Sequence, residues 1–239
     1  GFTGSMDIDR LDYNAFDTNV AGLTRLDWTK AVDLDGDGDA DLLNPGALLT
    51  GTPNLTIDMP ASLELRLQGS IEGTGPNVAG SPRLLQAGPL SIGGRAAFGL
   101  ERRVIDVDTD GNGNVDLLDA RLDIIALGVT NATVSVSQLA DLKVIGTLAL
   151  ARISAAGDSS ARYSALKMGA VTVSVIGTPT STFGLTGQLA IYALDSNSAA
   201  LGYDRLDWTA AVDLDADGAF DTIDPGLLLT GTPDLTLDL

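Results

Sequence analysis

The stretch RLDWTKAVDLDGDGDADLLNPGALLTGTPNLTIDM, residues 25–59, organises this chain of 239 residues. At its centre an aspartate stands at every second position, and Gly36 and Gly38 separate several of them. These aspartates are Asp33, Asp35, Asp37, Asp39 and Asp41. On a β-strand the pattern would place like charges on one face, which destabilises a sheet. Because glycine allows the chain to curl tightly, the pattern instead predicts a loop whose carboxylates converge on one point.

Two further loops repeat this pattern. The frame D-x-D-x-D-G-x-x-D recurs at Asp213, Asp215, Asp217 and Asp221. A longer version, read from Asp106, contains Asp106, Asp108, Asp110, Asn112, Asn114 and Asp116. In that frame the ninth position is Asn114, Asp116 follows two residues later, and either side chain is a candidate ligand. Ca²⁺ takes about six to eight oxygen ligands from carboxylates, carbonyl groups and water. A single loop of this kind could be a solvated acidic turn, but three of them predict calcium sites.

The whole stretch returns as RLDWTAAVDLDADGAFDTIDPGLLLTGTPDLTLDL, residues 205–239, at an offset of 180 with 24 of 35 residues identical. The lead-in recurs more loosely, with residues 16–19 (FDTN) aligned to 194–197 (LDSN). Solenoid and propeller repeats have periods of roughly 20–50 residues, so this period has the size of a domain. We therefore expect a tandem array, in which 1–24 ends one copy, 25–204 is a full unit and 205–239 starts the next.

Between the loops, short segments alternate apolar and polar residues, as half-buried strands do. The clearest are residues 55–59, 63–67, 134–136 and 171–175, and looser patterns cover 148–150 and 185–194. The best helical candidate is 117–127, with short helical turns near 137–142 and 161–168. The sequence predicts an all-β fold, a β-sandwich with hairpin or Greek-key connections, few short helices, and calcium loops on hairpins.

Composition excludes several classes of function. With 32 acidic residues against 14 basic ones the chain lacks the cationic surface that binds nucleic acid. It has no Cys and no His, which excludes disulfides, zinc–thiolate sites and an imidazole base. The motifs G-x-S-x-G and G-x-G-x-x-G are absent, so we expect no enzymatic activity. No apolar run approaches the length of a membrane-spanning helix, so we expect no membrane insertion.

The loops resemble calcium-binding cassettes of known families. Their first halves are similar to EF-hand and dockerin loops, although no amphipathic helices flank them. The full frame resembles FG-GAP and VCBS-like repeats and, more loosely, thrombospondin type 3 repeats, in which the ninth position closes the site; Asp41 and Asp221 stand there. Acidic, Cys-free, near-identical repeats of domain size resemble the repeat region of giant bacterial surface adhesins exported by type I secretion. That resemblance implies an extracellular chain that folds where calcium is abundant.

Three classes of function remain open at this point. The sequence favours a structural extender, rigidified by calcium, whose partners are neighbouring repeats of the same chain. The first alternative is an adhesive module for a glycan, a surface or another copy, but aromatic residues suited to sugar stacking are few. We expect Trp28 and Trp208 to pack in a core instead. The last alternative is a fragment of a carbohydrate-active enzyme, which needs two spaced carboxylates; many aspartate pairs are available and nothing selects one.

Overall fold

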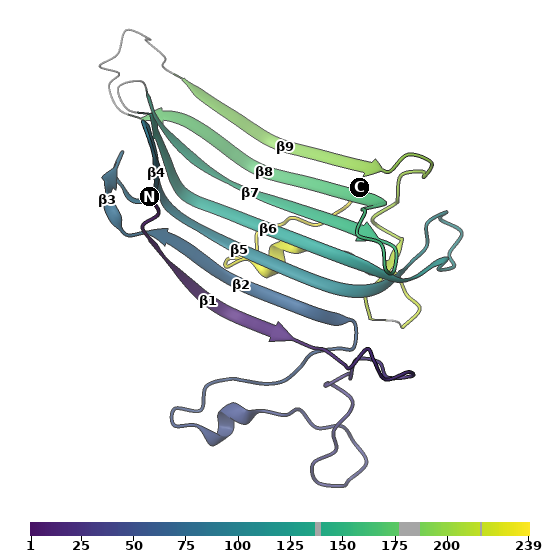
Figure 1. Ribbon diagram of the computed structural model, residues 1–239. Helices are drawn as coiled ribbons and strands as arrows, with labels where there is room; N and C mark the ends of the chain where they lie inside the picture. Colours follow the sequence, from purple (N-terminus) through teal and green to yellow (C-terminus); the bar gives the residue numbers. More distant parts are fainter. Residues whose placement is uncertain (137–139, 177–186, 216) are drawn as a thin grey trace.

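The computed structural model describes residues 1–136, 140–176, 187–215 and 217–239. These residues form a curved antiparallel sheet with the strand order β1-β2-β5-β6-β7-β8-β9 (Figure 1). Its strands are β1 (Gly4–Tyr13), β2 (Leu63–Gly73), β5 (Leu90–Val107), β6 (Leu117–Val136), β7 (Ala140–Ser154), β8 (Tyr163–Ile176) and β9 (Gln188–Ala199). The short strands β3 (Gly75–Val78) and β4 (Ser81–Ala87) pair with each other, and β4 also pairs with β5. The predicted all-β fold is confirmed.

The sandwich is not confirmed. In the described part of the chain, the layer packed on the sheet is residues 205–239, which we call the C-terminal cap. It contributes only the two-residue strand β10 (Val212–Asp213) and the 3₁₀ turn η2 (Pro225–Leu228). Its N-terminal counterpart, residues 25–59, contains the equivalent turn η1 (Pro45–Leu48). Backbone groups of both segments bond within local turns, such as Leu229 N–H to Gly226 O at 3.0 Å, so they do not extend into a second sheet.

The predicted helix at 117–127 is wrong, because these residues lie in β6. Ala120, Leu122, Ile124 and Ala126 alternate along the strand and are all buried, which is the period-two pattern of a sheet face. The turn predicted at 161–168 is likewise part of β8 from Tyr163 onward. Of the turn predicted near 137–142, residues 137–139 lie outside the described chain and the remainder begins β7. No described helix is long and apolar enough to span a membrane.

Most predicted strands are confirmed. Segments 63–67, 134–136, 148–150 and 171–175 lie in β2, β6, β7 and β8. The segment predicted at 185–194 enters β9 at Gln188, and residues 185–186 lie outside the described chain. The strand predicted at 55–59 is wrong: this segment makes one isolated bridge, Leu43 to Ile57.

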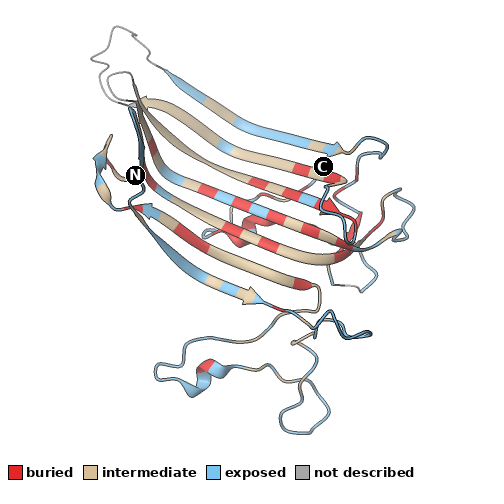
Figure 2. Ribbon diagram, in the orientation of Figure 1, coloured by how far each residue is buried: buried red, intermediate tan, exposed pale blue. Residues whose placement is uncertain are grey.

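The hydrophobic core lies between one face of the sheet and the C-terminal cap (Figure 2). The cap supplies large side chains that are at most 8% exposed, namely Leu206, Trp208, Val212, Ile223, Leu228, Leu229, Leu235 and Leu237. The sheet opposes them with many small ones, including Ala120, Ala126, Ala149, Ala151 and Ala165. A Cβ at Gly99 of β5 would overlap Leu228. Small residues on the sheet therefore let the cap lie close to the backbone of the strands.

Candidate metal centres

Asp33 organises the first loop. Its carboxylate accepts hydrogen bonds from the backbone N–H groups of Gly36 (2.6 Å) and Gly38 (3.0 Å). Both glycines have positive φ, +78° and +97°, a region that residues with a Cβ rarely adopt. At the other end, the Asp41 carboxylate accepts from Leu34 N–H at 2.7 Å. The aspartates at the first and ninth positions therefore fix the loop to its own backbone.

The third loop has the same geometry. Asp213 accepts from Gly218 N–H at 2.9 Å, and Asp221 accepts from Leu214 N–H at 2.7 Å. Asp221 N–H donates to Val212 O at 2.7 Å, as Asp41 N–H does to Val32 O in the first loop at 2.6 Å. The ninth-position aspartate therefore closes both loops, as the sequence frame predicts.

The second loop requires a correction of two residues. Asp108, not Asp106, accepts from two glycine N–H groups, those of Gly111 (2.8 Å) and Gly113 (2.6 Å). Asp116 closes the loop by accepting from Thr109 N–H at 2.8 Å. The first position is therefore Asp108 and the ninth is Asp116, not Asn114.

Asp106 lies before this loop, where its carboxylate accepts from Asp119 N–H at 2.9 Å. A signal for the corrected frame is present in the sequence, because DTDGNGNVD (108–116) aligns without gaps to DLDGDGDAD (33–41). The aspartate at 106 obscures it, since it extends the run of alternating acids by one step.

Carboxylates converge within two of the loops. Side-chain oxygens of Asp33, Asp35 and Asp37 lie within 4.8 Å of one another, and so do those of Asp213, Asp215 and Asp221. The first group is exposed, whereas Asp213 is only 7% exposed. Of the other predicted ligands in these loops, Asp39 and Asp217 are exposed and lie outside the two groups, and Asp41 lies outside the first group.

The second loop has a mixed set of oxygen donors. Asp108 is 2% exposed, and Asp110 and Asp116 supply the other carboxylates of the corrected frame. Asn112 and Asn114 contribute amide groups, and the Asn112 side-chain oxygen accepts from Asn114 N–H at 2.8 Å. With two amides in place of carboxylates, this loop offers less negative charge than the first.

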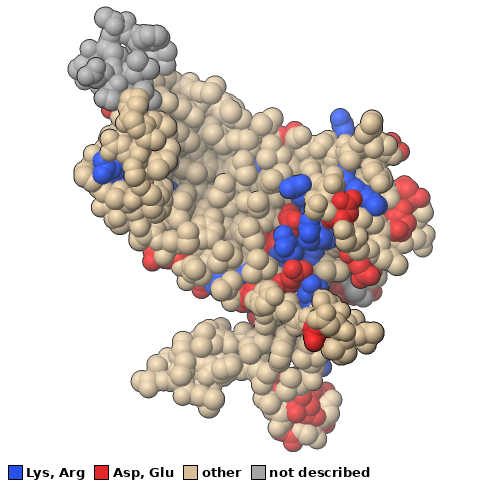
Figure 3. Space-filling view, in the orientation of Figure 1, with Lys and Arg blue, Asp and Glu red and all other residues tan. Residues whose placement is uncertain are grey.

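The second and third loops lie side by side, at one end of the sheet. The second closes the β5–β6 hairpin, as predicted. The prediction that the loops lie on hairpins is wrong for the other two, because in the described chain no named strand flanks the first loop and the third begins in β10, whose partner is β5. The third follows β10, which pairs with the end of β5 so that Asp213 stands opposite Asp106. The backbone also joins them directly, because Asp108 N–H donates to Ala211 O at 2.9 Å. The first loop is remote from the core, at an acidic tip of the segment that extends beyond β1 (Figures 1 and 3).

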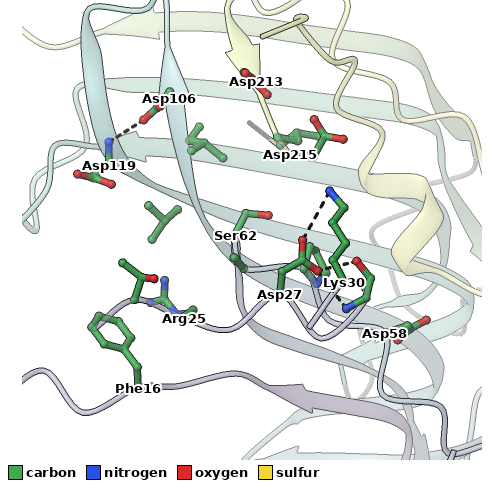
Figure 4. Close-up of a pocket in the computed structure, with 17 residues that line it drawn as sticks. Phe16, Arg25, Asp27, Lys30, Asp58, Ser62, Asp106, Asp119, Asp213 and Asp215 are labelled. Carbon is green, nitrogen blue, oxygen red and sulfur yellow. Dashed lines mark hydrogen bonds and ion pairs between the residues drawn. The ribbon is translucent and has the colours of Figure 1, made fainter. Parts of the chain in front are cut away.

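An open cleft of about 850 Å³ lies between the N-terminal segment on one side and the ends of β5 and β6 and the third loop on the other (Figure 4). Six aspartates line it: Asp27, Asp58, Asp106, Asp119, Asp213 and Asp215. Its basic residues are already near acids, since Lys30 Nζ lies 3.7 Å from Asp27 Oδ2 and Arg25 lies 2.7 Å from Glu64. The cleft is therefore an acidic surface between two parts of the chain.

The donor set fits a hard cation. The side-chain atoms in the three loops that could bind a metal are all oxygens, the ligand atoms that Ca²⁺ prefers. The N–H groups of Gly36 and Gly38 lower the pKa of Asp33. Burial raises the pKa of Asp108, but the N–H groups of residues 110–113 more than offset it, so the net pKa is below its ordinary value. A carboxylate has about four lone-pair sites, so an oxygen that accepts one N–H can still bind a cation.

Comparison of the chain with protein-family models, with curated proteins and with solved structures finds no match.

Proposed function

We propose that this chain is a calcium-stabilised structural repeat of a long extracellular protein. The observation that carries the proposal is the triple recurrence of one loop geometry, in which glycine and first-position aspartate organise a turn that a ninth-position aspartate closes. The resemblance of these repeats to surface adhesins supports the extracellular location. The neighbouring repeats of the same chain are the partners in this proposal.

Calcium would act on the fold through charge. Without a cation, carboxylates whose oxygens lie within 4.8 Å of one another repel each other. A cation that binds only the folded chain adds about 2.7 kcal/mol per site when its concentration is a hundred times Kd. The second loop closes the β5–β6 hairpin, and the third begins in β10, which pairs the cap with the end of β5, so these two sites would stabilise the core.

A structural role accounts for the tryptophans better than sugar binding or catalysis does. Trp208 is fully buried in the core, where it cannot stack on a glycan. Trp28 is only half-buried and is not part of the core, so the predicted core packing holds for Trp208 alone. The Trp28 indole N–H donates to Asn14 Oδ1 at 3.4 Å, and Trp208 makes the equivalent bond to Asn197 at 3.3 Å. Both rings are thus part of the same internal repeat.

Titration calorimetry of the whole chain with CaCl₂ tests the proposal. We expect about three calcium ions per chain, one for each loop. Mg²⁺, which demands strict octahedral geometry and dehydrates reluctantly, serves as the control and should bind more weakly. Absence of calcium binding at millimolar concentration would reject the proposal and leave the loops as acidic turns.

The corrected frame of the second loop makes a separate prediction. Asp108→Asn should weaken one calcium site at least tenfold, about 1.4 kcal/mol, because it removes the charge at the first position. Asp106→Asn is the matched control, two residues away and outside the loop, and should leave the site of the second loop unchanged. The same titration measures both variants. A loss with Asp106→Asn equal to that with Asp108→Asn would restore the original frame.

The lowered pKa values of Asp33 and Asp108 predict the pH dependence of binding. Their carboxylates ionise below the ordinary value of 3.8. The charge is therefore fully present above that value and is lost only as the pH falls through the lower, folded-state pKa. Calcium affinity should stay constant between about pH 7 and pH 5 and fall below about pH 4. Titrations across this range measure it; a decline already between pH 7 and 5 would disagree.

A further inference from the structure

Residues 25–59, which we call the N-terminal copy, and the C-terminal cap have the same local backbone structure. Trp28 N–H donates to Met59 O at 2.9 Å, and Trp208 N–H donates to Leu239 O at 2.8 Å. The same holds for Leu49 N–H to Gly46 O at 3.0 Å, which matches Leu229 to Gly226 in the cap at 3.0 Å. The two segments are therefore one structural module, present twice.

Their surroundings differ completely. The cap buries its apolar face on the sheet, whereas the N-terminal copy extends beyond β1 and is almost entirely exposed or half-buried (Figures 1 and 2). The exposed fractions of matched leucines show this: Leu26 46% and Leu206 2%, Leu48 89% and Leu228 8%, Leu49 52% and Leu229 5%, Leu55 50% and Leu235 0%. Exposed leucines whose equivalents form the buried face of the cap point to a binding interface.

The strands that precede the two modules are also equivalent. Asn14, just after β1, donates to Leu26 O at 2.9 Å, and Asn197 of β9 donates to Leu206 O at 2.8 Å. Asn14 rather than Asn19 therefore corresponds to Asn197, which corrects the lead-in alignment to an offset of 183. In that alignment β1 and β9 share Ile8 with Ile191, Leu11 with Leu194, and Asp12 with Asp195.

These two strands lie at opposite edges of the sheet and run in the same direction, because every pair between them is antiparallel. β9 pairs with β8, and β1 pairs with β2. A single strand of this sequence, with β8 of one unit on one side and β2 of the next unit on the other, would satisfy both pairings. The sheet would then continue from unit to unit.

We propose that β1 and the N-terminal copy form one docking surface for a second copy of this unit, placed ahead of it. β1 takes the place of that copy's β9 beside its β8. Residues 25–59 cover its sheet as the C-terminal cap covers the sheet seen in the structure. This inference rests on the tandem array in the proposed function, but it does not depend on calcium.

Charge and shape support this occupant. Lys167 of β8 stands opposite Asp195 in β9, and its Nζ lies 2.6 Å from Asp238 in the cap. Equivalent acids are present on the proposed docking surface: Asp12 of β1 corresponds to Asp195, and Asp58 of the N-terminal copy corresponds to Asp238. Leu228 packs where Gly99 leaves room, and Leu48 is its counterpart. Unpaired edge strands such as β1 readily accept another strand.

The assembly has one direction. In the described structure, β9 and the cap already occupy the place beside β8. The β1 strand and N-terminal copy of a separate molecule therefore cannot bind there. Joining therefore requires that one strand serve as both β9 and β1, which a tandem chain provides. The contact is head-to-tail, and repeating it gives an open, linear array.

A tandem chain tests the inference: residues 1–204 followed directly by residues 25–239. Its middle module corresponds to residues 25–59 and follows a single β9-like strand. Hydrogen exchange should be as slow in this middle module as in the C-terminal cap. In the original chain, residues 25–59 should exchange at least about tenfold faster than 205–239, because little tertiary packing protects them. A middle module that exchanges as fast as the free N-terminal copy would overturn the inference.

A matched substitution provides the control. Leu48→Asp in the original chain should leave the melting temperature unchanged, whereas Leu228→Asp should lower it. In the tandem chain, Leu48→Asp in the middle module should lower the melting temperature as Leu228→Asp does. No effect there would contradict docking. Calcium titration of the tandem chain separates the two proposals, because docking without calcium binding would reject only the proposed function.

If the tandem chain does not fold, a second variant still decides. It is the original chain with the sequence of residues 25–59 in place of 205–239, which changes 11 positions. Slow exchange of this substituted cap would support the inference. A substituted cap that leaves the sheet uncovered and exchanges rapidly would contradict it.

Discussion

Moving this chain from millimolar calcium into EGTA should lower its melting temperature by roughly 10–20 °C. The second loop closes the β5–β6 hairpin, and the third begins in β10, which pairs the C-terminal cap with β5. Two sites, each about 2.7 kcal/mol at a hundredfold excess over Kd, sum to about 5 kcal/mol. A domain of this size changes its melting temperature by about 2–4 °C per kcal/mol. The first loop, remote from the core, should add little to this shift.

Thermal melts followed by circular dichroism measure the effect, with Mg²⁺ as the control cation. Asp213→Asn should reduce the calcium-dependent shift substantially, because Asp213 is buried at the junction of cap and sheet. Asp33→Asn, in the exposed first loop, should leave most of the shift intact. Identical melting temperatures in calcium and in EGTA would show that the loops do not act as folding sites.

The second large effect is a contrast between equivalent leucines. Leu235→Ala should lower the free energy of unfolding by about 2–5 kcal/mol, the usual range for a fully buried leucine. Leu235 is 0% exposed, whereas Leu55, at the same position of the N-terminal copy, is 50% exposed. Leu55→Ala should therefore change the free energy of unfolding by no more than about 0.5 kcal/mol.

Urea denaturation of both variants measures this contrast, with the same leucine-to-alanine chemistry in each. Leu55 follows Asn54 and Leu235 follows Asp234, and a threonine comes after each leucine. The local sequence around the two substitutions is therefore nearly the same. Equal losses of stability in the two variants would mean that the N-terminal copy is already buried in the isolated chain.

Period-two patterns identified parts of β2, β6, β7, β8 and β9, because a half-buried strand must alternate its side chains. They missed β1, β3, β4 and the central strand β5. The helix predicted at 117–127 is instructive. Leu118, Leu122 and Ile125 fit a helical stripe, but the face that packs against the cap is Ala120, Leu122, Ile124 and Ala126. Alanine gives a weak apolar signal in a sequence, yet here its small size is what admits the cap.

The loops were predictable in position and less so in frame. A glycine follows Asp33 and Asp213 five residues later in the sequence. In the structure the N–H of that glycine donates to the aspartate, as the predicted frame requires. In the second loop an additional aspartate upstream, Asp106, imitates the first position. The hydrogen bonds from Gly111 and Gly113 to Asp108 identify the true start, and the gapless alignment of 108–116 to 33–41 agrees with it.

The sequence could not predict that the two modules differ in burial. With 24 of 35 residues identical, residues 25–59 and 205–239 adopt the same turns, because local bonds determine turns. Whether the leucines are covered depends on a sheet that only one of the two segments meets. Tertiary packing, rather than local propensity, makes that difference.

Peptide-resolved hydrogen exchange of the whole chain, in calcium and in EGTA, tests the central claim that calcium holds these loops. We expect residues 108–116 and 213–221 to exchange slowly with calcium and rapidly without it, and the cap to exchange faster together with them. Residues 33–41 should also respond to calcium, while the rest of the N-terminal copy exchanges rapidly in both conditions. Exchange in all three loops that is the same with and without calcium would show that calcium does not hold them.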